Sequence, residues 1–196
     1  MLDIRSLKRE IRIVGWDDAP FDKHDKTVRI FGAIFRGGSW MDGLLSTKIR
    51  IDGDDATKKI ASVLNETRHK KQLRIIMLDG ITLGGFNVVD LEKLHKETDM
   101  GVIAVSRKMP EFLKIKRALI KVRDGGKKWA LIEKAGAPVK MEISGRSIYY
   151  QSCGINRKDA ADVIRLSSTR ALIPEPLRIA HIIASGVVKG ESRGRA

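Results

Sequence analysis

The sequence is short of cysteine and has no long apolar run. Its 196 residues contain a single cysteine, Cys153, so no disulfide can form within the chain, and a reducing compartment such as the cytoplasm is expected. No apolar stretch approaches the roughly 20 residues that cross a bilayer, so no membrane association is expected. The charged residues 1–10 form a polar lead-in without the apolar core of a secretion signal.

Positive charge is what the chain has in excess. Lys and Arg number 38 against 24 Asp and Glu, which gives a formal net charge of +14 at pH 7. A surplus of this size favours polyanionic partners, above all nucleic acid, although a lysine-rich surface can also serve solubility alone. The apolar share of 42% is ordinary for a globular chain, and 196 residues are enough for a single domain over residues 1–196 with its own core.

The first part of the chain predicts three consecutive β-strands. Residues 11–16, 28–35 and 44–51 are rich in Val, Ile and Phe or alternate apolar with polar side chains. Residues 36–39, Arg-Gly-Gly-Ser, supply the turn between the second and third strands. Short links between consecutive strands predict an antiparallel meander.

The periodicity then changes to helices that alternate with strands. Helical spacing predicts one helix that begins near Asp55 or Thr57 and another over 88–98, and apolar runs predict strands over 73–78 and 101–105. Three strands followed by helix, strand, helix and strand predict an α/β fold whose mixed sheet is flanked by helices. This order is the layout of the ribonuclease H-like fold.

The last third predicts smaller elements and a flexible tail. The expected helices cover 111–122, 156–166 and 177–185, and the expected strands cover 129–133, 139–143 and 148–151. Pro176 suits the first position of the last helix. Residues 187–196, which end rich in Gly and Arg, are expected to be a flexible tail.

Two of the predicted strands end on an aspartate. Residues 12–16 lead into Asp17, and residues 73–78 lead into Asp79. In a ribonuclease H-like sheet the first and fourth strands are neighbours, so the two carboxylates would repel each other unless a cation neutralised them. We therefore predict that Asp17 and Asp79 bind Mg²⁺ or Mn²⁺ beside a phosphate. The alternative is that each aspartate caps the loop that follows it.

The motifs, taken together, resemble endonuclease V over about residues 11–184. Residues 13–17 and 77–80 are similar to that family's two strands with a metal-binding Asp, and residues 101–108 are similar to its Gly-Val-Ala-Lys strand. The most specific match is 172–181, Leu-Ile-Pro-Glu-Pro-Leu-Arg-Ile-Ala-His, which resembles the family's C-terminal signature; residues 148–154 resemble its Tyr-Val-Ser-x-Gly strand.

The resemblance is closer still to an archaeal family of endonuclease V relatives of unassigned function. Residues 15–21 match that group's Gly-x-Asp-Asp-x-Pro-Phe opening, and residues 84–87 match its Gly-Gly-Phe-Asn turn. The resemblance implies a metal-dependent endonuclease that cuts DNA or RNA, with specificity for deaminated sites such as hypoxanthine or inosine. The implied catalytic residues are Asp17, Asp79, Lys108 and His181; a solvated lysine and a packed helix histidine are the alternatives for the last two.

Two features depart from the endonuclease V pattern, and a third adds to it. Residues 37–43 occupy the place of its proline-containing wedge, and no Glu stands where its third metal ligand should be. Asp52 or Asp55 lies there instead and would substitute with a shorter side chain. Residues 111–139 look like an insertion. The missing Glu keeps a rival function open, a nucleic-acid-binding protein that retains the nuclease fold without a complete metal site.

The nucleic acid itself is expected to contact turns and side chains around the two aspartates. Trp40 can stack on a base, although hairpin packing or a subunit contact is an equal alternative, and the oligomeric state stays open. Gly84 and Gly85 can bring backbone amides close to a base or phosphate, or simply form a turn. The full predicted set is Trp40, Gly80, Gly84, Gly85, Asn87, Arg107 and Arg178.

Overall fold

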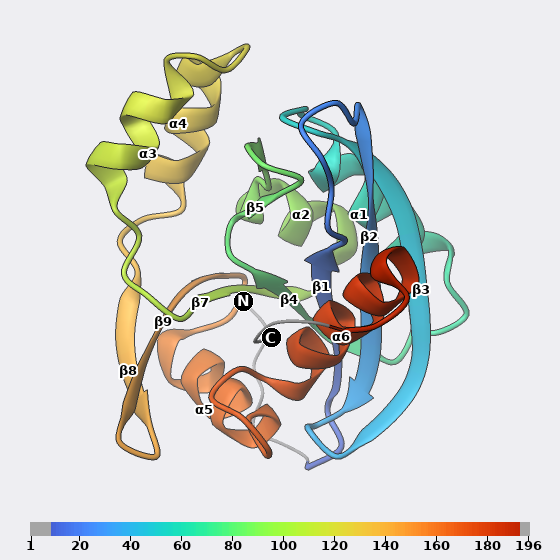
Figure 1. Cartoon of the computed structure of the whole chain (residues 1–196). Helices are drawn as coiled ribbons and strands as arrows, with labels where there is room; N and C mark the ends of the chain where they lie inside the picture. Colours follow the sequence, from blue (N-terminus) through green and yellow to red (C-terminus); the bar gives the residue numbers. More distant parts are fainter. Residues whose placement is uncertain (1–8, 193–196) are drawn as a thin grey trace.

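The structure, a computed structural model, describes residues 9–192, which build a seven-stranded mixed sheet of order β3-β2-β1-β4-β7-β9-β8 (Figure 1). Strands β1 (Arg12–Asp18), β2 (Thr27–Arg36) and β3 (Trp40–Arg50) form the expected antiparallel meander. Gly32 of β2 lies opposite Trp16 of β1, where a Cβ would be 2.8 Å from the buried indole. Glycine at this position therefore makes room for the largest side chain of the core.

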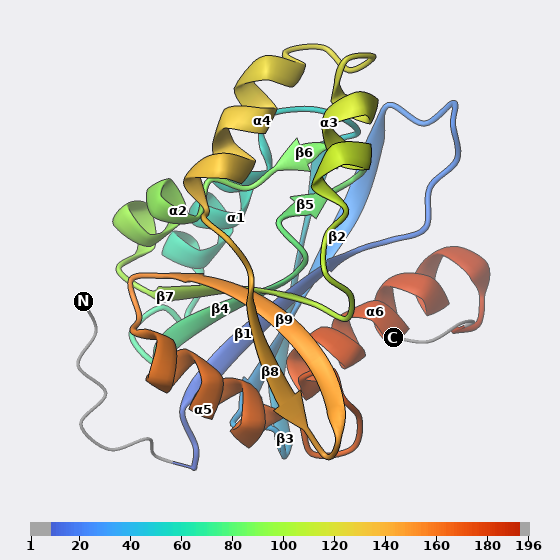
Figure 2. The same ribbon diagram turned by 90° about the vertical axis from the view of Figure 1, so that its left-hand side faces the viewer.

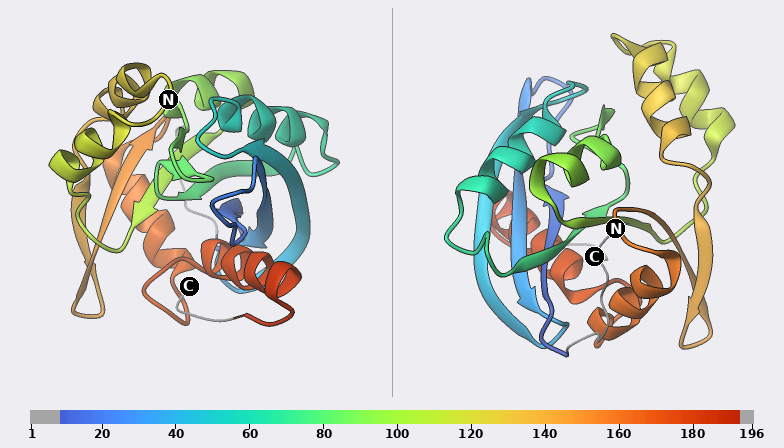
Figure 3. Two further views of the ribbon diagram at one scale, coloured as in Figure 1. Left: turned by 45° about the horizontal axis from the view of Figure 1, so that its top comes forward. Right: turned by 180° about the vertical axis from the view of Figure 1, so that it is seen from behind.

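The centre of the sheet is parallel, as the alternation of helices and strands predicted. Strand β4 (Leu73–Asp79) pairs with β1 on one side and with β7 (Gly101–Ser106) on the other. The crossover helices α1 (Ala56–Glu66) and α2 (Leu91–Thr98) cover one face of the sheet, as the view from behind shows (Figure 3). Between β4 and α2, β5 (Thr82–Leu83) and β6 (Asn87–Val88) form a small antiparallel ribbon.

The opposite face is covered by α5 (Arg157–Ser167) and α6 (Glu175–Lys189) (Figure 1). Strands β8 (Val139–Ile143) and β9 (Arg146–Cys153) complete the sheet at the edge opposite β3. Helix α6 lies directly on β1, because a Cβ at Gly15 would be 2.4 Å from the backbone carbon of Pro176. This close approach brings the middle of α6 next to the end of β1.

A helical hairpin stands at one end of the molecule (Figure 2). It consists of α3 (Phe112–Leu119) and α4 (Gly125–Lys134), so the strand predicted over 129–133 is wrong. Trp129 of α4 packs edge-on against Phe112 of α3, with ring centroids 6.3 Å apart. Periodicity alone does not distinguish a buried strand from a buried helix segment in such a short apolar run, and the contact with α3 decides for the helix.

Other predicted boundaries shift by a few residues. Helix α2 begins at Leu91 rather than Val88, because Asp90 accepts a hydrogen bond from the backbone N–H of Lys93 and caps the helix. Helix α6 continues to Lys189, three residues into the predicted tail, and Gly190 ends it in a left-handed conformation. The rest of the polar lead-in before Arg9, and residues 193–196 of the predicted tail, lie outside the described residues. Within residues 9–192 there is no helix with the length and apolar character that crossing a membrane requires.

Candidate active site

The two strand-end aspartates become neighbours at the centre of the sheet. Trp16 of β1 pairs in register with Leu78 of β4, so Asp17 and Asp79 follow side by side on adjacent strands, which run about 4.8 Å apart. Side chains alternate across a strand. Ile13 and Met77, which precede the aspartates by an even number of residues, lie in the core beneath α5 and α6. Both carboxylates therefore face the α6 side of the sheet.

His181 of α6 meets Asp17 there. Its Nδ1 lies 2.8 Å from Asp17 Oδ2, and the backbone N–H of Asp18 donates to Asp17 Oδ1 at 2.8 Å. The hydrogen bond that the protonated ring of His181 donates to Asp17 raises the pKa of His181, although partial burial works against it. Asp17 is buried, so the histidine holds this carboxylate in one orientation.

The ionised forms of the other two carboxyl groups, Asp79 and Asp18, are disfavoured in this environment. Burial, and then the charge of Asp17, raise the pKa of Asp79 to about 6. The same two causes raise the pKa of Asp18 to about 6, although its Oδ2 accepts a hydrogen bond from the Gly84 backbone N–H at 2.5 Å. A cation placed among these groups would relieve the repulsion.

These groups line an open pocket of about 600 Å³. Its lining residues are Asp17, Asp18, Ala19, Pro20, Phe21, Asp79, Gly80, Ser106, Arg107 and His181. Arg107 follows β7 and lowers the pKa of Asp79 by its charge. Asp18, Phe21 and Ser106 were not among the predicted site residues. The signal for the first two was present in residues 15–21, the motif shared with the archaeal family.

The carboxylate oxygens of the pocket suit one hard divalent cation that takes only a few of its ligands from the protein. Within residues 9–192 no three His, Cys, Asp or Glu side chains are grouped so that they can hold a metal ion together. Asp18 is bonded to Gly84, and one oxygen of Asp17 is bonded to His181, so these groups do not converge. Mg²⁺ commonly uses only one or two carboxylates and keeps water or phosphate as its other ligands. Asp17 and Asp79 fit that pattern.

The two aspartates predicted to replace the missing third ligand are engaged elsewhere. Asp52 Oδ1 accepts a hydrogen bond from the Phe86 N–H at 2.7 Å, and Asp52 lies in a left-handed turn with φ of 51°. Asp55 Oδ1 accepts hydrogen bonds from the Arg50 N–H and from Asn87 Nδ2. Neither lines the acidic pocket. Asp18 lines the acidic pocket instead, because it follows Asp17 at the end of β1.

Asn87 is fully buried, contrary to the expectation that it contacts nucleic acid. Its Nδ2 donates to Arg50 O at 2.9 Å, and its Oδ1 accepts from the Ala56 N–H at 3.1 Å. Asn87 therefore holds the start of α1 against the end of β3. Arg178 donates from Nη2 to Glu175 Oε2 at 2.7 Å, one turn away on α6, and lies outside the pocket lining.

Lys108 is exposed and is not among the lining residues, whereas its neighbour Arg107 is. The chain turns here, and Ser106 Oγ donates to Lys108 O at 3.1 Å. Trp40 is 65% exposed at the start of the edge strand β3. Gly80 lies in the pocket with φ of 79°.

The Gly84–Gly85 turn touches the site through one bond only. The Gly84 N–H donates to Asp18, and a Cβ at Gly85 would be 2.4 Å from Asp52 Oδ1. Both glycines have positive φ. The turn therefore supports Asp18 and accommodates Asp52, and Gly85 is outside the pocket lining.

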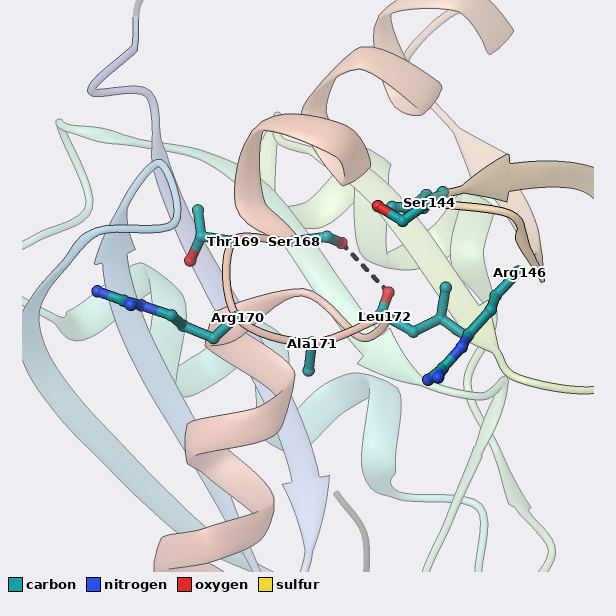
Figure 4. Close-up of a pocket in the computed structure, with 8 residues that line it drawn as sticks. Ser144, Arg146, Ser168, Thr169, Arg170, Ala171 and Leu172 are labelled. Carbon is teal, nitrogen blue, oxygen red and sulfur yellow. Dashed lines mark hydrogen bonds between the residues drawn. The ribbon is translucent and has the colours of Figure 1, made fainter.

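Another pocket, of about 290 Å³, lies between the β8–β9 turn and the α5–α6 loop (Figure 4). It contains hydroxyl groups and two arginines, Arg146 and Arg170, which lie on opposite sides of it. It has neither a carboxylate nor a histidine in its lining. The acidic pocket is therefore the better candidate for chemistry.

Comparison with known proteins identifies the family. A family model described as Endonuclease dU matches residues 9–188. The chain belongs to the endonuclease dU family. A UPF0215 protein of Methanothermobacter thermautotrophicus is 52% identical over 196 residues, which are 99% of this chain and 96% of that protein. A UPF0215 protein of Methanosarcina acetivorans is 50% identical over 192 residues, 97% of each chain.

Solved structures show the same fold as this member of the endonuclease dU family. A protein of unknown function from Archaeoglobus fulgidus is 34% identical, with a TM-score of 0.81 over 90% of this chain and 97% of that one. Ciona intestinalis endonuclease V, in complex with DNA that contains an inosine, is 14% identical, with a TM-score of 0.61 over 94% and 89%. The expected ribonuclease H-like, endonuclease V-like fold is thereby confirmed.

Proposed function

We propose that this protein is a divalent-metal-dependent endonuclease that hydrolyses phosphodiester bonds in nucleic acid at deaminated bases. The observation that supports this most is the pair Asp17 and Asp79, which end adjacent strands on the same face of the sheet and share a pocket with His181 and Arg107. The endonuclease dU family and the endonuclease V-like fold point to the same reaction class.

Four residues of the pocket have specific tasks at the phosphate in this proposal. Asp17 and Asp79 hold Mg²⁺ or Mn²⁺ by one oxygen or more each. A bound ion of this kind supplies a more nucleophilic water and offsets the charge that builds on the phosphate. His181 keeps Asp17 in orientation and, when protonated, adds positive charge beside the scissile phosphate. Arg107 pairs with a phosphate oxygen, and Lys108, exposed one residue further on, contacts the nucleic-acid backbone.

Phe21 is the group in the pocket that suits a base. Its ring is 38% exposed among polar and charged neighbours. Aromatic side chains stack on unpaired bases with a free energy of about 1–3 kcal/mol per base. Two deaminated bases are to be considered: uracil, because the family name contains dU, and hypoxanthine, because a structural neighbour is bound to DNA with inosine.

A second function is favoured by one observation. Since the described residues include no three-ligand metal group, a protein that binds nucleic acid without cutting it fits the same fold. Such a protein would bind phosphates through its Lys and Arg surplus, with an affinity that falls steeply with salt.

Cleavage assays separate the two functions. Duplex and single-stranded DNA and RNA oligonucleotides with one hypoxanthine, one uracil or only normal bases are incubated with the protein and Mg²⁺ or Mn²⁺. We expect cuts near the deaminated base that require the metal and disappear in Asp79→Asn. The matched control is Asp99→Asn, because Asp99 is exposed and its left-handed conformation tolerates asparagine. Binding without cleavage under every metal condition would establish the second function instead.

A further inference from the structure

The hairpin α3–α4 carries a concentration of positive charge. Of residues 111–134, eight are Lys or Arg and three are Asp or Glu. Several of these cations have carboxylate partners, such as Lys127 with Asp124 and Lys134 with Glu92. Arg117 and Lys121 have no carboxylate within ion-pair distance among residues 9–192. The outer helix therefore presents unneutralised charge to solvent.

The outward face of α3 also carries exposed apolar groups. Leu113 is 76% exposed and Ile120 is 82% exposed, and their spacing of seven positions places both on one side of the helix. Arg117 lies between them on that side, whereas Lys116 places its ammonium over the Trp129 ring of α4, 5.0 Å from the ring centroid. The other side of α3 is already partnered, since Phe112 and Leu119 pack in the cluster that includes Trp129 of α4. We call Leu113, Arg117, Ile120 and Lys121 the α3 outer face; Lys121 follows the end of the helix and also lines a pocket with Asp52 and Asp54.

The hairpin is fastened to loops that border the acidic pocket. Lys128 of α4 is 4% exposed, and its Nζ donates to the backbone oxygens of Gly53 and Phe86. The turn that contains Phe86 also contains Gly84, whose N–H holds Asp18. At its other end the hairpin follows β7, and Phe112 comes five positions after Arg107 of the pocket. Five positions span at most about 18 Å.

The arrangement places α3 on the side where the two aspartates face. In Figure 2, α3 stands above the side of the sheet on which α6 lies, and α4 stands above the side of α1 and α2. Helix α3 is about 12 Å long, which corresponds to roughly three or four nucleotides along a duplex strand. A strand whose phosphate lies at Asp17 and Asp79 has its flanking nucleotides within reach of this helix.

We propose that the α3 outer face binds the sugar-phosphate backbone that flanks the cleavage site. This inference rests on the proposed function, because it names the second contact surface of the same substrate. Arg117 and Lys121 contact phosphates, and Leu113 and Ile120 cover the sugars between them. Charge complementarity selects nucleic acid as the occupant over a second copy of this chain, whose net charge of +14 would oppose association.

Binding is measured without cleavage, so that the two proposals can fail separately. Fluorescence anisotropy in EDTA follows a labelled oligonucleotide that extends ten nucleotides on each side of a single uracil or hypoxanthine. The test variant is Arg117→Gln with Lys121→Gln. The matched control is Lys59→Gln with Lys71→Gln, exposed lysines on α1 and at the start of β4, away from the strand ends that carry the aspartates.

We expect the test variant to bind about tenfold more weakly near 0.1 M salt, and its slope of log K against log salt to be less steep by about one to two. The control should be nearly unchanged. Equal losses in both pairs, or no loss in either while the unmodified protein binds, would overturn the hairpin proposal and leave the cleavage proposal intact. No binding by the unmodified protein would overturn the hairpin proposal, and the cleavage assays, which contain the metal, test the proposed function separately.

The two apolar residues of the α3 outer face, Leu113 and Ile120, are tested separately. Leu113→Gln with Ile120→Gln is expected to weaken binding by a few fold and to leave the mass in solution, measured by light scattering, unchanged. A lower mass with unchanged nucleic-acid affinity would show that the α3 outer face joins two copies of the chain, and the proposal would be wrong.

Discussion

The imidazole Nδ1 of His181 lies 2.8 Å from Asp17 Oδ2, although 164 residues separate the two in the chain. The contact connects the last helix to the end of the first strand, and it exists because Gly15 lets α6 lie directly on β1. When protonated, His181 also adds positive charge to a pocket that holds three carboxyl groups.

The carboxyl repulsion predicts how the stability of the metal-free protein depends on pH. Because the folded-state pKa of Asp79 is raised from 3.8 to about 6, its stabilising contribution is present below pH 3.8 and is lost as the pH rises through 6. We expect Asp79→Asn to be more stable than the unmodified protein at pH 7.5, by up to about 3 kcal/mol, and the difference to shrink toward pH 4. Urea denaturation at several pH values measures it. A difference that does not change with pH would contradict the repulsion.

A divalent cation should relieve the same repulsion. We expect Mn²⁺ or Mg²⁺ at pH 7.5 to raise the unfolding temperature of the unmodified protein, with a stabilisation of about 2.7 kcal/mol at one hundred times the dissociation constant. Asp17→Asn and Asp79→Asn should lose the shift, and Asp99→Asn should keep it. Differential scanning fluorimetry with and without EDTA measures the effect. An equal shift in all four proteins would place the metal elsewhere.

Because α6 lies in close contact with β1, the protein should be sensitive to any side chain added at Gly15. An added methyl group would lie 2.4 Å from Pro176 and force the helix outward. We expect Gly15→Ala to cost about 1–3 kcal/mol in free energy of unfolding, and the chemical shifts of His181 to move as its contact with Asp17 lengthens. Gly126→Ala is the control, because nothing lies within 4 Å of a Cβ there and alanine favours the helix α4. A similar loss in both variants would contradict the packing argument.

The hydrogen bonds of the buried Lys128 should contribute to the stability of the hairpin α3–α4. Lys128→Met keeps the length of the side chain but leaves the oxygens of Gly53 and Phe86 without their donor. We expect a loss of about 1–3 kcal/mol in stability and faster hydrogen exchange in residues 112–134, measured by mass spectrometry. Lys127→Met, at an exposed neighbouring position, should show neither effect. Unchanged exchange in Lys128→Met would mean that apolar packing alone holds the hairpin.

We expect substitutions of Phe21 to change substrate binding and to leave the chemical step nearly unchanged. If its ring stacks on a base, Phe21→Ala raises KM for a substrate with a deaminated base by roughly 5- to 100-fold, corresponding to 1–3 kcal/mol, and changes kcat little. Phe21→Trp should restore KM. A fall in kcat at unchanged KM in Phe21→Ala would assign the ring to the chemistry instead of to base recognition.

The meander of the first three strands and the parallel centre of the sheet were predictable from the chain. Continuous apolar runs, such as residues 73–78, identify central strands without reference to their neighbours. The strand predicted over 129–133 failed because an apolar run of five residues fits a strand or a helix equally, and the Phe112–Trp129 contact that decides between them comes from a separate segment.

The sequence by itself determined the sheet, the two aspartates at its centre and the positive surplus of the chain, because alternation and run length act locally. Only the tertiary structure decided which groups accompany the aspartates. Asp52 and Asp55 are turned toward Phe86 and Asn87, while Asp18, Phe21 and Arg107 enter the pocket. The physical reason is that a side chain's partner depends on where other strands and helices end, and those positions are set by packing across the whole sheet.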